Sequence, residues 1–328
     1  MNILVTGGCG FIGSNFINYF IKKYLNYKIY NLDILYYCAS LNNISEPNHP
    51  NYKFIEGDIK SQDLINFILK EFEITHVIHF AAQSHVDNSF NNSLQYTSDN
   101  IIGTHNLLEC LRKYQLNTNK LKLMIHISTD EVYGESELND NAKTEMSILC
   151  PTNPYAATKA ASELLVQSYI HSYKLPIIIT RGNNVYGPRQ YPEKLIPKFM
   201  NLLINNEKCT IHGDGKNLRS FIYIDDVVKA FDLIFHKGQL TNIYNIGTSN
   251  EYNVLDITIR IISIVNDGLF EDNITYVEDR NFNDKRYFVN YDKLTSLGWQ
   301  QSIDIDEGLT RTYKWIKSIN SKTYWNIK

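Results

Sequence analysis

Four of the 16 glycines in this 328-residue chain lie within its first thirteen positions. Gly7, Gly10 and Gly13 follow the apolar run Asn2–Thr6 and lead into a segment with helical periodicity. Glycine at these places allows a tight turn, close approach of main-chain N–H groups to a phosphate, and close packing of a helix on a strand. The pattern therefore predicts a strand, a phosphate-binding turn and a helix, in that order.

A flexible loop would also tolerate three glycines, so the next predicted strand decides between the two interpretations. That strand, Lys28–Asp33, ends in an acid twenty residues after Gly13, where a carboxylate that binds the adenosine ribose 2′-hydroxyl belongs. A carboxylate there would repel a 2′-phosphate, so the pattern favours NAD over NADP. Asp58 and Ile59 end the third predicted strand and either contact the adenine or form a simple turn.

Strand and helix patterns alternate through the first half of the chain. This alternation predicts an α/β fold in which a parallel sheet is covered on both faces, and right-handed crossovers make the sheet doubly wound. The predicted strands are Asn2–Thr6, Lys28–Asp33, Tyr52–Glu56, His76–Ala82, Lys122–Ser128 and Pro176–Arg181. The predicted helices are Gly13–Leu25, Gln62–Phe72, Ser93–Tyr114 and Pro154–Tyr173.

The rhythm changes after about residue 188, where short strands and helices follow at uneven spacing. We expect an NAD-binding domain over residues 1–188, with elements near 222–247 returning to its sheet. Residues 189–320 are expected to form a smaller α+β substrate lobe, and residues 321–328 a frayed tail. The elements expected after residue 188 are a helix at Pro192–Ile204 and strands at Thr210–His212, Phe221–Tyr223 and Ile243–Ile246.

Composition argues against several classes of protein. The 32 Lys and Arg residues nearly balance the 35 Asp and Glu residues, whereas a general nucleic-acid binder carries a basic excess. No apolar run approaches the roughly 18 residues of a membrane span. The five scattered cysteines include no CxxC pair that would suggest a zinc site or a disulfide framework. We therefore expect a cytoplasmic protein with no metal site, membrane segment or nucleic-acid partner.

Tyr155 and Lys159 are one helical turn apart and share a face. The spacing alone is weak evidence, because Tyr19 and Lys23 have it too. Asn153 and the proline after it distinguish the first pair, since an N-cap and an N1 proline place the tyrosine in the first helical turn, near the sheet's carboxyl end. The Lys159 ammonium and a cationic nicotinamide are expected to lower the tyrosine pKa from about 10, so that the side chain can accept a hydroxyl proton.

Two adjacent carboxylates, Asp130 and Glu131, follow the apolar strand Leu123–Ile127. Carboxylates at a strand's carboxyl end are not core residues, so they form either a solvated turn or an acid–base pair. In a continuing strand the two side chains would point to opposite faces. We therefore predict that the strand breaks by Thr129, which would let both carboxylates reach one pocket.

Together these motifs resemble those of the extended short-chain dehydrogenases, and most of all the nucleotide-diphosphate-glucose (NDP-glucose) 4,6-dehydratases. The resemblance runs from Met1 to about Ile319 and implies a Rossmann sheet with a nucleotide-sugar lobe. Related epimerases carry small residues at both carboxylate positions, and GDP-mannose dehydratases and UDP-glucuronate decarboxylases usually show Thr-Ser-Glu, so Thr-Asp-Glu favours glucose dehydration. The motifs that carry the resemblance are Gly7–Gly13, His79–Ala82, Thr129–Glu131, Tyr155 with Lys159, and Pro192–Pro197.

The resemblance implies a reaction in which NAD is recovered. Tyr155 would remove the C4 hydroxyl proton while NAD takes a hydride from C4, with Thr129 hydrogen-bonded to the C4 oxygen. Glu131 would then remove the C5 proton, Asp130 would protonate the leaving C6 hydroxyl, and the hydride would return to C6. Burial beside an ionised Glu131 is expected to keep Asp130 protonated near neutral pH.

The same resemblance assigns binding residues. Arg and Lys suit a diphosphate, although each alone could equally be a surface charge, and His79 and His85 alone could be ordinary core histidines. The expected NAD-binding residues are Gly7, Gly10, Phe11, Ile12, Gly13, Asp33, Asp58, Ile59, Ala81, Ala82, Tyr155 and Lys159. The expected substrate-binding residues are Ser84, His85, Asn184, Glu193, Lys194, Arg219 and Arg280.

Two further expectations follow from the resemblance. The helices near 93–114 and 154–173 would build a homodimer. Thr180–Pro188 and Arg280–Asp284 look like the eukaryotic branch, including plant rhamnose-pathway enzymes, so the nucleotide is left as UDP or dTDP. A sugar-nucleotide epimerase or decarboxylase and a non-catalytic NAD-binding regulator are the alternative functions.

Overall fold

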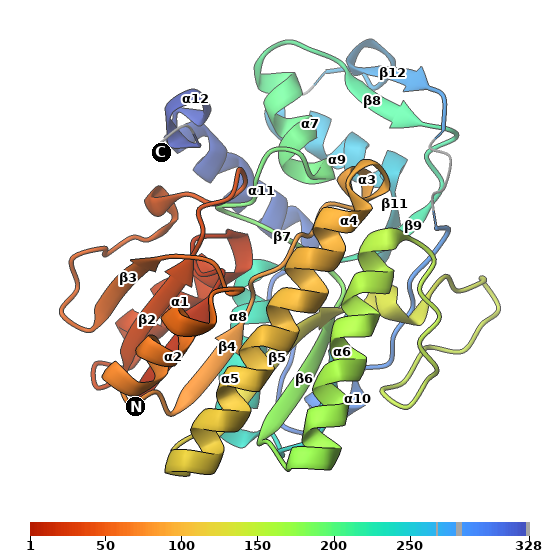
Figure 1. Cartoon of the computed structure of the whole chain (residues 1–328). Helices are drawn as coiled ribbons and strands as arrows, with labels where there is room; N and C mark the ends of the chain where they lie inside the picture. Colours follow the sequence, from red (N-terminus) through yellow and green to blue (C-terminus); the bar gives the residue numbers. More distant parts are fainter. Residues whose placement is uncertain (267, 280–283, 326–328) are drawn as a thin grey trace.

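A parallel sheet of seven strands forms the centre of the computed structural model, which describes residues 1–266, 268–279 and 284–325 (Figure 1). The strand order is β10-β6-β5-β4-β1-β2-β3, so the chain winds first to one side of β1 and then to the other. The doubly wound α/β prediction is confirmed. The strands are β1 (Asn2–Thr6), β2 (Lys28–Asp33), β3 (Tyr52–Glu56), β4 (His76–His79), β5 (Leu123–Thr129), β6 (Ile177–Gly182) and β10 (Ile243–Ile246).

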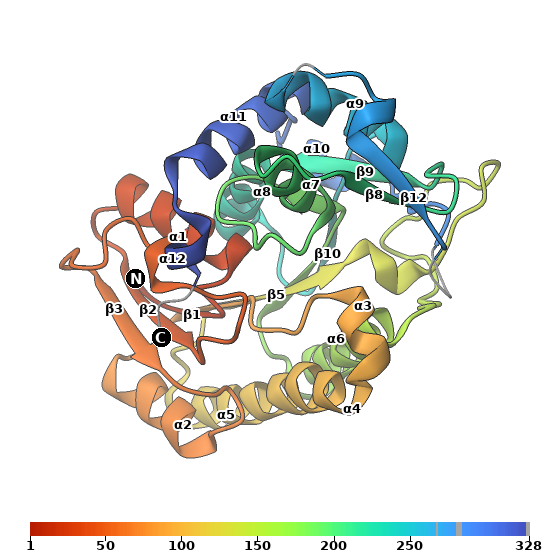
Figure 2. The ribbon, with the colours of Figure 1, turned by 90° about the horizontal axis from the view of Figure 1, so that it is seen from above.

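Helices cover both faces of this sheet, as Figure 2 shows from above. Alternate residues of β1 enter different cores, with Ile3 packed among residues of α1 and α8 and Leu4 among residues of α2, α5 and α6. Strands buried on both sides in this way have near-continuous apolar sequences. The helices are α1 (Phe11–Lys23) and α8 (Ile224–Lys237) on one face, and α2 (Gln62–Glu71), α5 (Gly103–Thr118) and α6 (Pro154–Tyr173) on the other.

The segment predicted as one helix over Ser93–Tyr114 is interrupted. It consists of α4 (Ser93–Tyr96), a π-helical segment η2 (Thr97–Ile102) and α5. Asn100 lies in the π segment, where its side chain accepts the main-chain N–H of Gln83 at 2.7 Å and donates to the Gln83 carbonyl at 3.1 Å. The extra residue per turn thus lets a helix residue fix the loop after β4.

The second half of the chain builds a smaller α+β lobe around its own apolar core, in which Phe199, Ile257 and Leu309 take part. β10 nevertheless returns to the large sheet beside β6. The division at residue 188 stays a prediction. The remaining elements are η1 (Leu41–Asn43), α3 (Val86–Asn91), η3 (Asp130–Tyr133), β7 (Asn184–Tyr186), α7 (Leu195–Ile204), β8 (Cys209–His212), β9 (Leu218–Tyr223), β11 (Glu251–Asn253), α9 (Val254–Val265), η4 (Glu271–Asn273), β12 (Ile274–Val277), α10 (Asp292–Thr295), α11 (Ile305–Ser318) and α12 (Ser321–Tyr324).

The tail predicted to fray from residue 321 is anchored as far as the structure describes it. The Tyr324 hydroxyl donates to the Asn43 side chain at 2.8 Å, and the Tyr324 carbonyl accepts the Ser40 hydroxyl at 2.9 Å. Trp325 contacts the ring of Tyr191. Over residues 321–325 the structure thus differs from a frayed tail, because aromatic side chains there contact distant parts of the chain. Among the described helices, none is long and apolar enough to cross a membrane.

Candidate functional site

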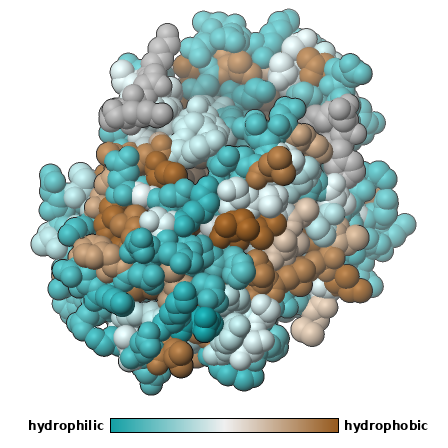
Figure 3. Space-filling model, in the orientation of Figure 1, coloured by the Kyte–Doolittle hydropathy of each residue, from teal (hydrophilic) through white to brown (hydrophobic). Residues whose placement is uncertain are grey.

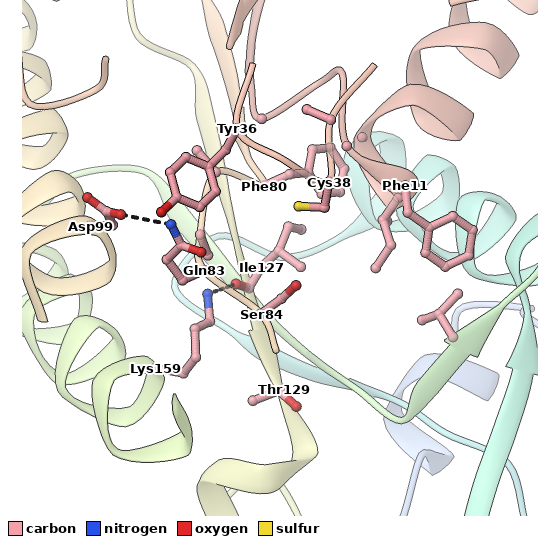
Figure 4. Close-up of a pocket in the computed structure, with 18 of the residues that line it drawn as sticks. Phe11, Tyr36, Cys38, Phe80, Gln83, Ser84, Asp99, Ile127, Thr129 and Lys159 are labelled. Carbon is pink, nitrogen blue, oxygen red and sulfur yellow. Dashed lines mark hydrogen bonds between the residues drawn. The ribbon is translucent and has the colours of Figure 1, made fainter. Parts of the chain in front are cut away.

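A cavity of about 370 Å³ opens at the carboxyl edge of the sheet, where the strand order reverses (Figure 4). Open α/β sheets bind their ligands at such a switch point. Every residue predicted to bind NAD lines this cavity, from the glycine turn to Tyr155 and Lys159. The structure therefore gathers at one site residues spread over more than 150 positions of sequence.

The glycine turn leaves room for a dinucleotide on its open side. At its tightest points no residue larger than glycine fits. Gly7 has a φ of +72°, and a Cβ there would lie 2.6 Å from the main-chain nitrogen of Ala81. A Cβ on Gly13 would lie 2.5 Å from the Gly7 carbonyl oxygen. A Cβ on Gly10 would meet only that oxygen, at 3.3 Å, so its open side is available to a phosphate. These residues fit NAD.

Asp33 ends β2 with its carboxylate fixed. One oxygen accepts the Cys9 N–H at 2.8 Å and the other accepts the Leu35 N–H at 2.8 Å. Burial raises the pKa of this carboxyl, while the two hydrogen bonds lower it. Asp58 closes a strand-end turn by accepting the Lys60 N–H at 2.8 Å, and it also lines the cavity. This geometry is compatible with both interpretations of Asp58, a simple turn and a contact with the adenine.

Tyr155 and Lys159 lie in the first turns of α6, where the Asn153 side chain caps the helix through the Ala156 N–H at 2.8 Å. The Lys159 ammonium donates to the Ile127 carbonyl at 2.7 Å, as Figure 4 shows. Burial lowers the pKa of Lys159 to about 8.

The expected lowering of the Tyr155 pKa is wrong for the groups that the protein supplies. Burial raises this pKa, the Glu131 carboxylate raises it further, and a hydrogen bond with Thr129 opposes the shift. The expectation counted Lys159 and a cationic nicotinamide but left out the burial of the tyrosine, which is the largest cause of the shift. The tyrosine also faces two carboxyl groups, Glu131 and Asp130.

The strand break predicted at Thr129 is confirmed. β5 ends at Thr129, and Asp130–Tyr133 form the 3₁₀ turn η3. Glu131 lines the large cavity and accepts the Asn153 amide at 3.1 Å. Asp130 does not line it: its side chain is 3% exposed and bonded to Asn183 at 2.6 Å and Thr129 at 3.1 Å. The expectation of two carboxylates open to one pocket is therefore met by Glu131 only.

Burial raises the pKa of Asp130 to about 6 and that of Glu131 to about 7. The expected upward shift of the Asp130 pKa is therefore present. Asn183 and Thr129 both donate to Asp130 and stabilise its charged form, whereas the neighbouring Asp130 carboxylate raises the pKa of Glu131. As interacting groups, the two carboxyls titrate as a pair, and burial keeps a proton on the pair to a higher pH than on free carboxyls.

A second cavity, of about 220 Å³, continues from the first toward the smaller lobe. The two cavities share lining residues, so a molecule in the second cavity reaches Glu131, which also lines the first. The shared residues include Glu131, Asn184, Glu193 and Lys194. Arg219 also lines the second cavity. The expected ligands of a nucleotide sugar are thus gathered at one place, except Arg280, which lies outside the described residues.

Two charged residues at the junction of the cavities have partners in the protein. Lys194 donates to the Ser84 carbonyl at 2.8 Å, and burial lowers its pKa. Glu193 accepts the Tyr37 hydroxyl at 2.9 Å and lies 4.0 Å from the His85 ring. Glu193 therefore positions its neighbours as well as lining the site.

The sequence and the fold are similar to those of a known family. The family model described as GDP-mannose 4,6 dehydratase matches residues 4–312. A dTDP-D-glucose 4,6-dehydratase of Dictyostelium discoideum is 47% identical over 98% of this chain and 82% of its own. The chain belongs to the NDP-glucose 4,6-dehydratases of the extended short-chain dehydrogenase superfamily.

Two other members of this family are informative. The trifunctional UDP-glucose 4,6-dehydratase/UDP-4-keto-6-deoxy-D-glucose 3,5-epimerase/UDP-4-keto-L-rhamnose-reductase of Arabidopsis thaliana is 50% identical over 96% of this chain. The chain spans only 47% of that longer protein. The crystal structure of dTDP-glucose 4,6-dehydratase from Bacillus anthracis in complex with NAD superposes with a TM-score of 0.88, at 37% identity and 97% coverage of both chains.

Sequence reasoning missed three asparagines that hold the site together. Asn100 fixes Gln83, Asn153 donates to Glu131 while capping α6, and Asn183 donates to Asp130. Only Asn153 had a detectable signal, as the cap before the proline, and its second contact had none. A carboxamide makes such double contacts because it carries a donor and an acceptor.

Proposed function

We propose that this chain dehydrates UDP-glucose or dTDP-glucose to the 4-keto-6-deoxy sugar in a rhamnose-type deoxysugar pathway, with NAD as a cofactor that is recovered. The observation that carries the proposal is the turn after β5, which places Thr129 and Glu131 in the cavity with Tyr155 and buries Asp130 directly behind them. A sugar-nucleotide oxidation alone would need no such carboxyl pair.

The first chemical step falls to Tyr155 and its neighbours. Bound NAD accepts a hydride from C4 of the sugar and later returns one to C6. The Tyr155 tyrosinate takes the C4 hydroxyl proton, and Thr129, which is hydrogen-bonded with Tyr155, orients the C4 oxygen. Lys159 stands one turn along the same helix and stabilises the tyrosinate before it accepts this proton.

The carboxyl pair performs the elimination. Glu131 takes the proton at C5, which the C4 ketone has made acidic, and Asp130 gives a proton to the C6 hydroxyl as it leaves as water. A carboxyl pair that shares one proton has the right total charge for this step. Glu131 then returns its proton to C5.

The second cavity suits the nucleotide diphosphate. Lys194 and Arg219 provide positive charge, and Asn184 provides a carboxamide, while Ser84 and His85 lie toward the sugar. Arg219 is already stacked at 5.2 Å over Tyr287, another residue of this cavity. A stacked guanidinium is held in one orientation, as recognition of a phosphate requires.

The proposal is tested by incubating the protein separately with UDP-glucose and dTDP-glucose, with NAD and no added reductant. Mass analysis should show loss of one water without net reduction of NAD. A product of unchanged mass would instead indicate an epimerase, and loss of carbon dioxide from a glucuronate substrate a decarboxylase. If neither glucose nucleotide reacts, the proposal is overturned and a regulatory NAD-binding role gains support.

The two bases differ by one methyl group, which a pocket discriminates by only about 1–3 kcal/mol. We therefore expect both nucleotides to be accepted, with a ratio of kcat/KM between about 10 and 200. Competition of the two sugars in one tube measures this ratio directly.

We also propose that the enzyme is a cytoplasmic homodimer. Large apolar side chains are exposed along α4, η2, α5 and α6, and Figure 3 shows hydrophobic groups among hydrophilic ones on the face that these helices present in Figure 1. Exposed apolar residues on neighbouring helices are typical of a helix-packed interface. They are Leu94, Ile102, Leu116, Leu164 and Tyr173.

Light scattering after size-exclusion chromatography tests the dimer. Ile102→Glu combined with Leu164→Glu should convert a dimer to a monomer. Leu240→Glu changes an exposed leucine that follows α8 and should leave the mass unchanged. A monomeric wild-type protein would contradict the proposal.

A further inference from the structure

Asn183 directly follows β6 and contacts Asp130 through a side chain that can face only one way. Its Oδ1 accepts the main-chain N–H of Thr248 at 3.1 Å, and its Nδ2 lies 2.6 Å from Oδ2 of Asp130. A main-chain N–H can only donate, so the carboxamide oxygen must face Thr248 and the NH₂ group must face Asp130. The side chain is 4% exposed, so no water competes freely for either contact.

This orientation determines which oxygen of Asp130 can carry a proton. An NH₂ group only donates, so Oδ2 of Asp130 must accept, whether or not the carboxyl is charged. A proton therefore resides on Oδ1. That oxygen is 3.1 Å from the Thr129 hydroxyl, which can donate or accept, and Thr129 lines the large cavity.

We propose that Asn183 is the positioning residue for Asp130, holding Oδ2 as an acceptor and reserving Oδ1, on the side of the cavity, for the proton that leaves with the C6 hydroxyl. The inference rests on the proposed function for its chemistry. As Glu131 takes the C5 proton, the C5–C6 double bond forms, the C6–O bond breaks, and the Oδ1 proton departs in the water. Glu131 ends neutral and Asp130 ends charged.

The negative charge that develops on Asp130 is the charge that Asn183 stabilises. Hydrogen bonds to ionised acceptors are shorter and stronger than those between neutral groups. The charged or titratable groups that face Asp130 are Glu131 on the same turn, Arg219 from β9 and Tyr155 from α6. Arg219 lowers the Asp130 pKa less than the Asn183 hydrogen bond does, so this donor is the main opponent of the shift caused by burial.

The test compares Asn183→Ala with Asn245→Ala. Asn245 is a fully buried carboxamide on the adjacent strand β10, bonded to the Tyr133 hydroxyl and to the carbonyls of Lys143 and Asn290. Both variants lose an equal side chain from a buried hydrogen-bond network. Only the first loses a donor to Asp130.

The first measurement needs no substrate. Without the Asn183 donor, the Asp130 pKa rises further, so the folded state binds more protons than the unfolded state and its stability falls more steeply as pH rises. The loss of Tm in Asn183→Ala should therefore grow between pH 5.5 and 8.5, while the loss in Asn245→Ala stays constant. Losses that do not change with pH in either variant would overturn the inference.

The second measurement uses whichever sugar nucleotide the wild-type enzyme dehydrates. Asn183→Ala should slow water loss by about tenfold or more and leave the rate of C4 oxidation nearly unchanged. Because elimination needs a protonated Asp130, its decline at alkaline pH should move to higher pH. Equal slowing of both steps with an unmoved decline would overturn the inference.

Two further outcomes are decisive. If Asn183→Ala does not fold, Asn183→Leu keeps the approximate size of the side chain and loses the donor without adding a charge, so the same pH-dependent loss of Tm is expected. If the wild-type enzyme dehydrates neither sugar, the proposed function fails, whereas the Tm comparison still decides whether Asn183 controls Asp130.

Discussion

Two turns at the carboxyl edge of the sheet, Gly7–Gly13 after β1 and Asp130–Tyr133 after β5, are held in different ways. The glycine turn has main-chain contacts of its own, with the Gly10 N–H donating to the Gly7 carbonyl and the Ser14 N–H to the Gly10 carbonyl, and the side chains of Asp33 and Asn43 bond to it at the main chain of Cys9. In the acid–base turn the two carboxylates themselves are held by side chains from elsewhere, namely Asn153, the N-cap of α6, and Asn183 after β6. Substitutions in the first turn should therefore act by steric clash, and substitutions in the second by changing proton transfer.

The largest effect is expected at the acid–base turn. Asp130→Asn removes the proton donor but keeps a group that can still bond to Thr129. Water loss should slow by about 10²–10⁴-fold, the usual contribution of a general acid, while C4 oxidation continues. Mass analysis follows the loss of water, and the absorbance of reduced nicotinamide follows C4 oxidation.

Glu137→Gln is a matched control for the Asp130 variant, because Glu137 is an exposed acid that pairs with Lys285 on the surface. It should change neither step. If C4 oxidation disappears in Asp130→Asn along with water loss, the role given to Asp130 is wrong, and the two turns do not divide the work as described.

The next effect is expected at the glycine turn. Gly7→Ala places a Cβ against the Ala81 nitrogen at a positive φ, which costs about 1–3 kcal/mol in backbone strain. Tm should fall, and NAD affinity should fall about 5- to 140-fold, since each 1.4 kcal/mol is a factor of about ten. Calorimetric titration and a thermal melt measure the two quantities.

Gly10→Ala separates the two causes. Its Cβ would meet only the Gly7 carbonyl oxygen, at 3.3 Å, so Tm should stay close to wild type. The methyl group still occupies the space offered to the phosphate, so NAD affinity should fall. Equal Tm losses in the two variants would show that the turn is not held by the contact at Gly7.

The difference between the turns also explains what could be predicted from sequence. The glycine turn and Asp33 are encoded by neighbours in the chain, and the alternation of apolar strands with amphipathic helices predicted β1–β3 and α6 with their observed bounds. The hydrogen bonds that Glu131 and Asp130 accept come from Asn153 and Asn183, which no local sequence pattern links to the carboxylates. The π segment was missed because one extra residue in a turn leaves the apolar spacing almost unchanged.

A smaller effect is expected at Asp33. Asp33→Asn removes the negative charge that would face a 2′-phosphate, so the affinity for NADP relative to NAD should rise about tenfold. Asp58→Asn is the control, because Asp58 closes a turn and lies 3.5 Å from the Lys60 ammonium. It should leave the ratio unchanged. An equal change of this ratio in both variants would contradict the assignment of Asp33 as the carboxylate that binds the ribose 2′-hydroxyl.

The smallest effect, a few degrees of Tm, is expected from Glu131→Gln. Burial raises the pKa of Glu131 to about 7, so the folded protein keeps a proton that the unfolded chain loses near pH 4.5. The stability that this proton provides is present at low pH and is lost as pH rises through about 7. Glutamine stays neutral, so the variant should gain Tm relative to wild type between pH 5.5 and 8.5.

The control for this last prediction is Glu73→Gln, because Glu73 is an exposed acid paired with Lys120 and its pKa is lowered. It is ionised throughout this range, so its effect should not change with pH. A Glu131→Gln difference that is equally flat would mean that the carboxylate is well solvated or paired in its charged form. In that case the stability of the acid–base turn would not depend on a bound proton, as that of the glycine turn does not, and the contrast between the turns would disappear.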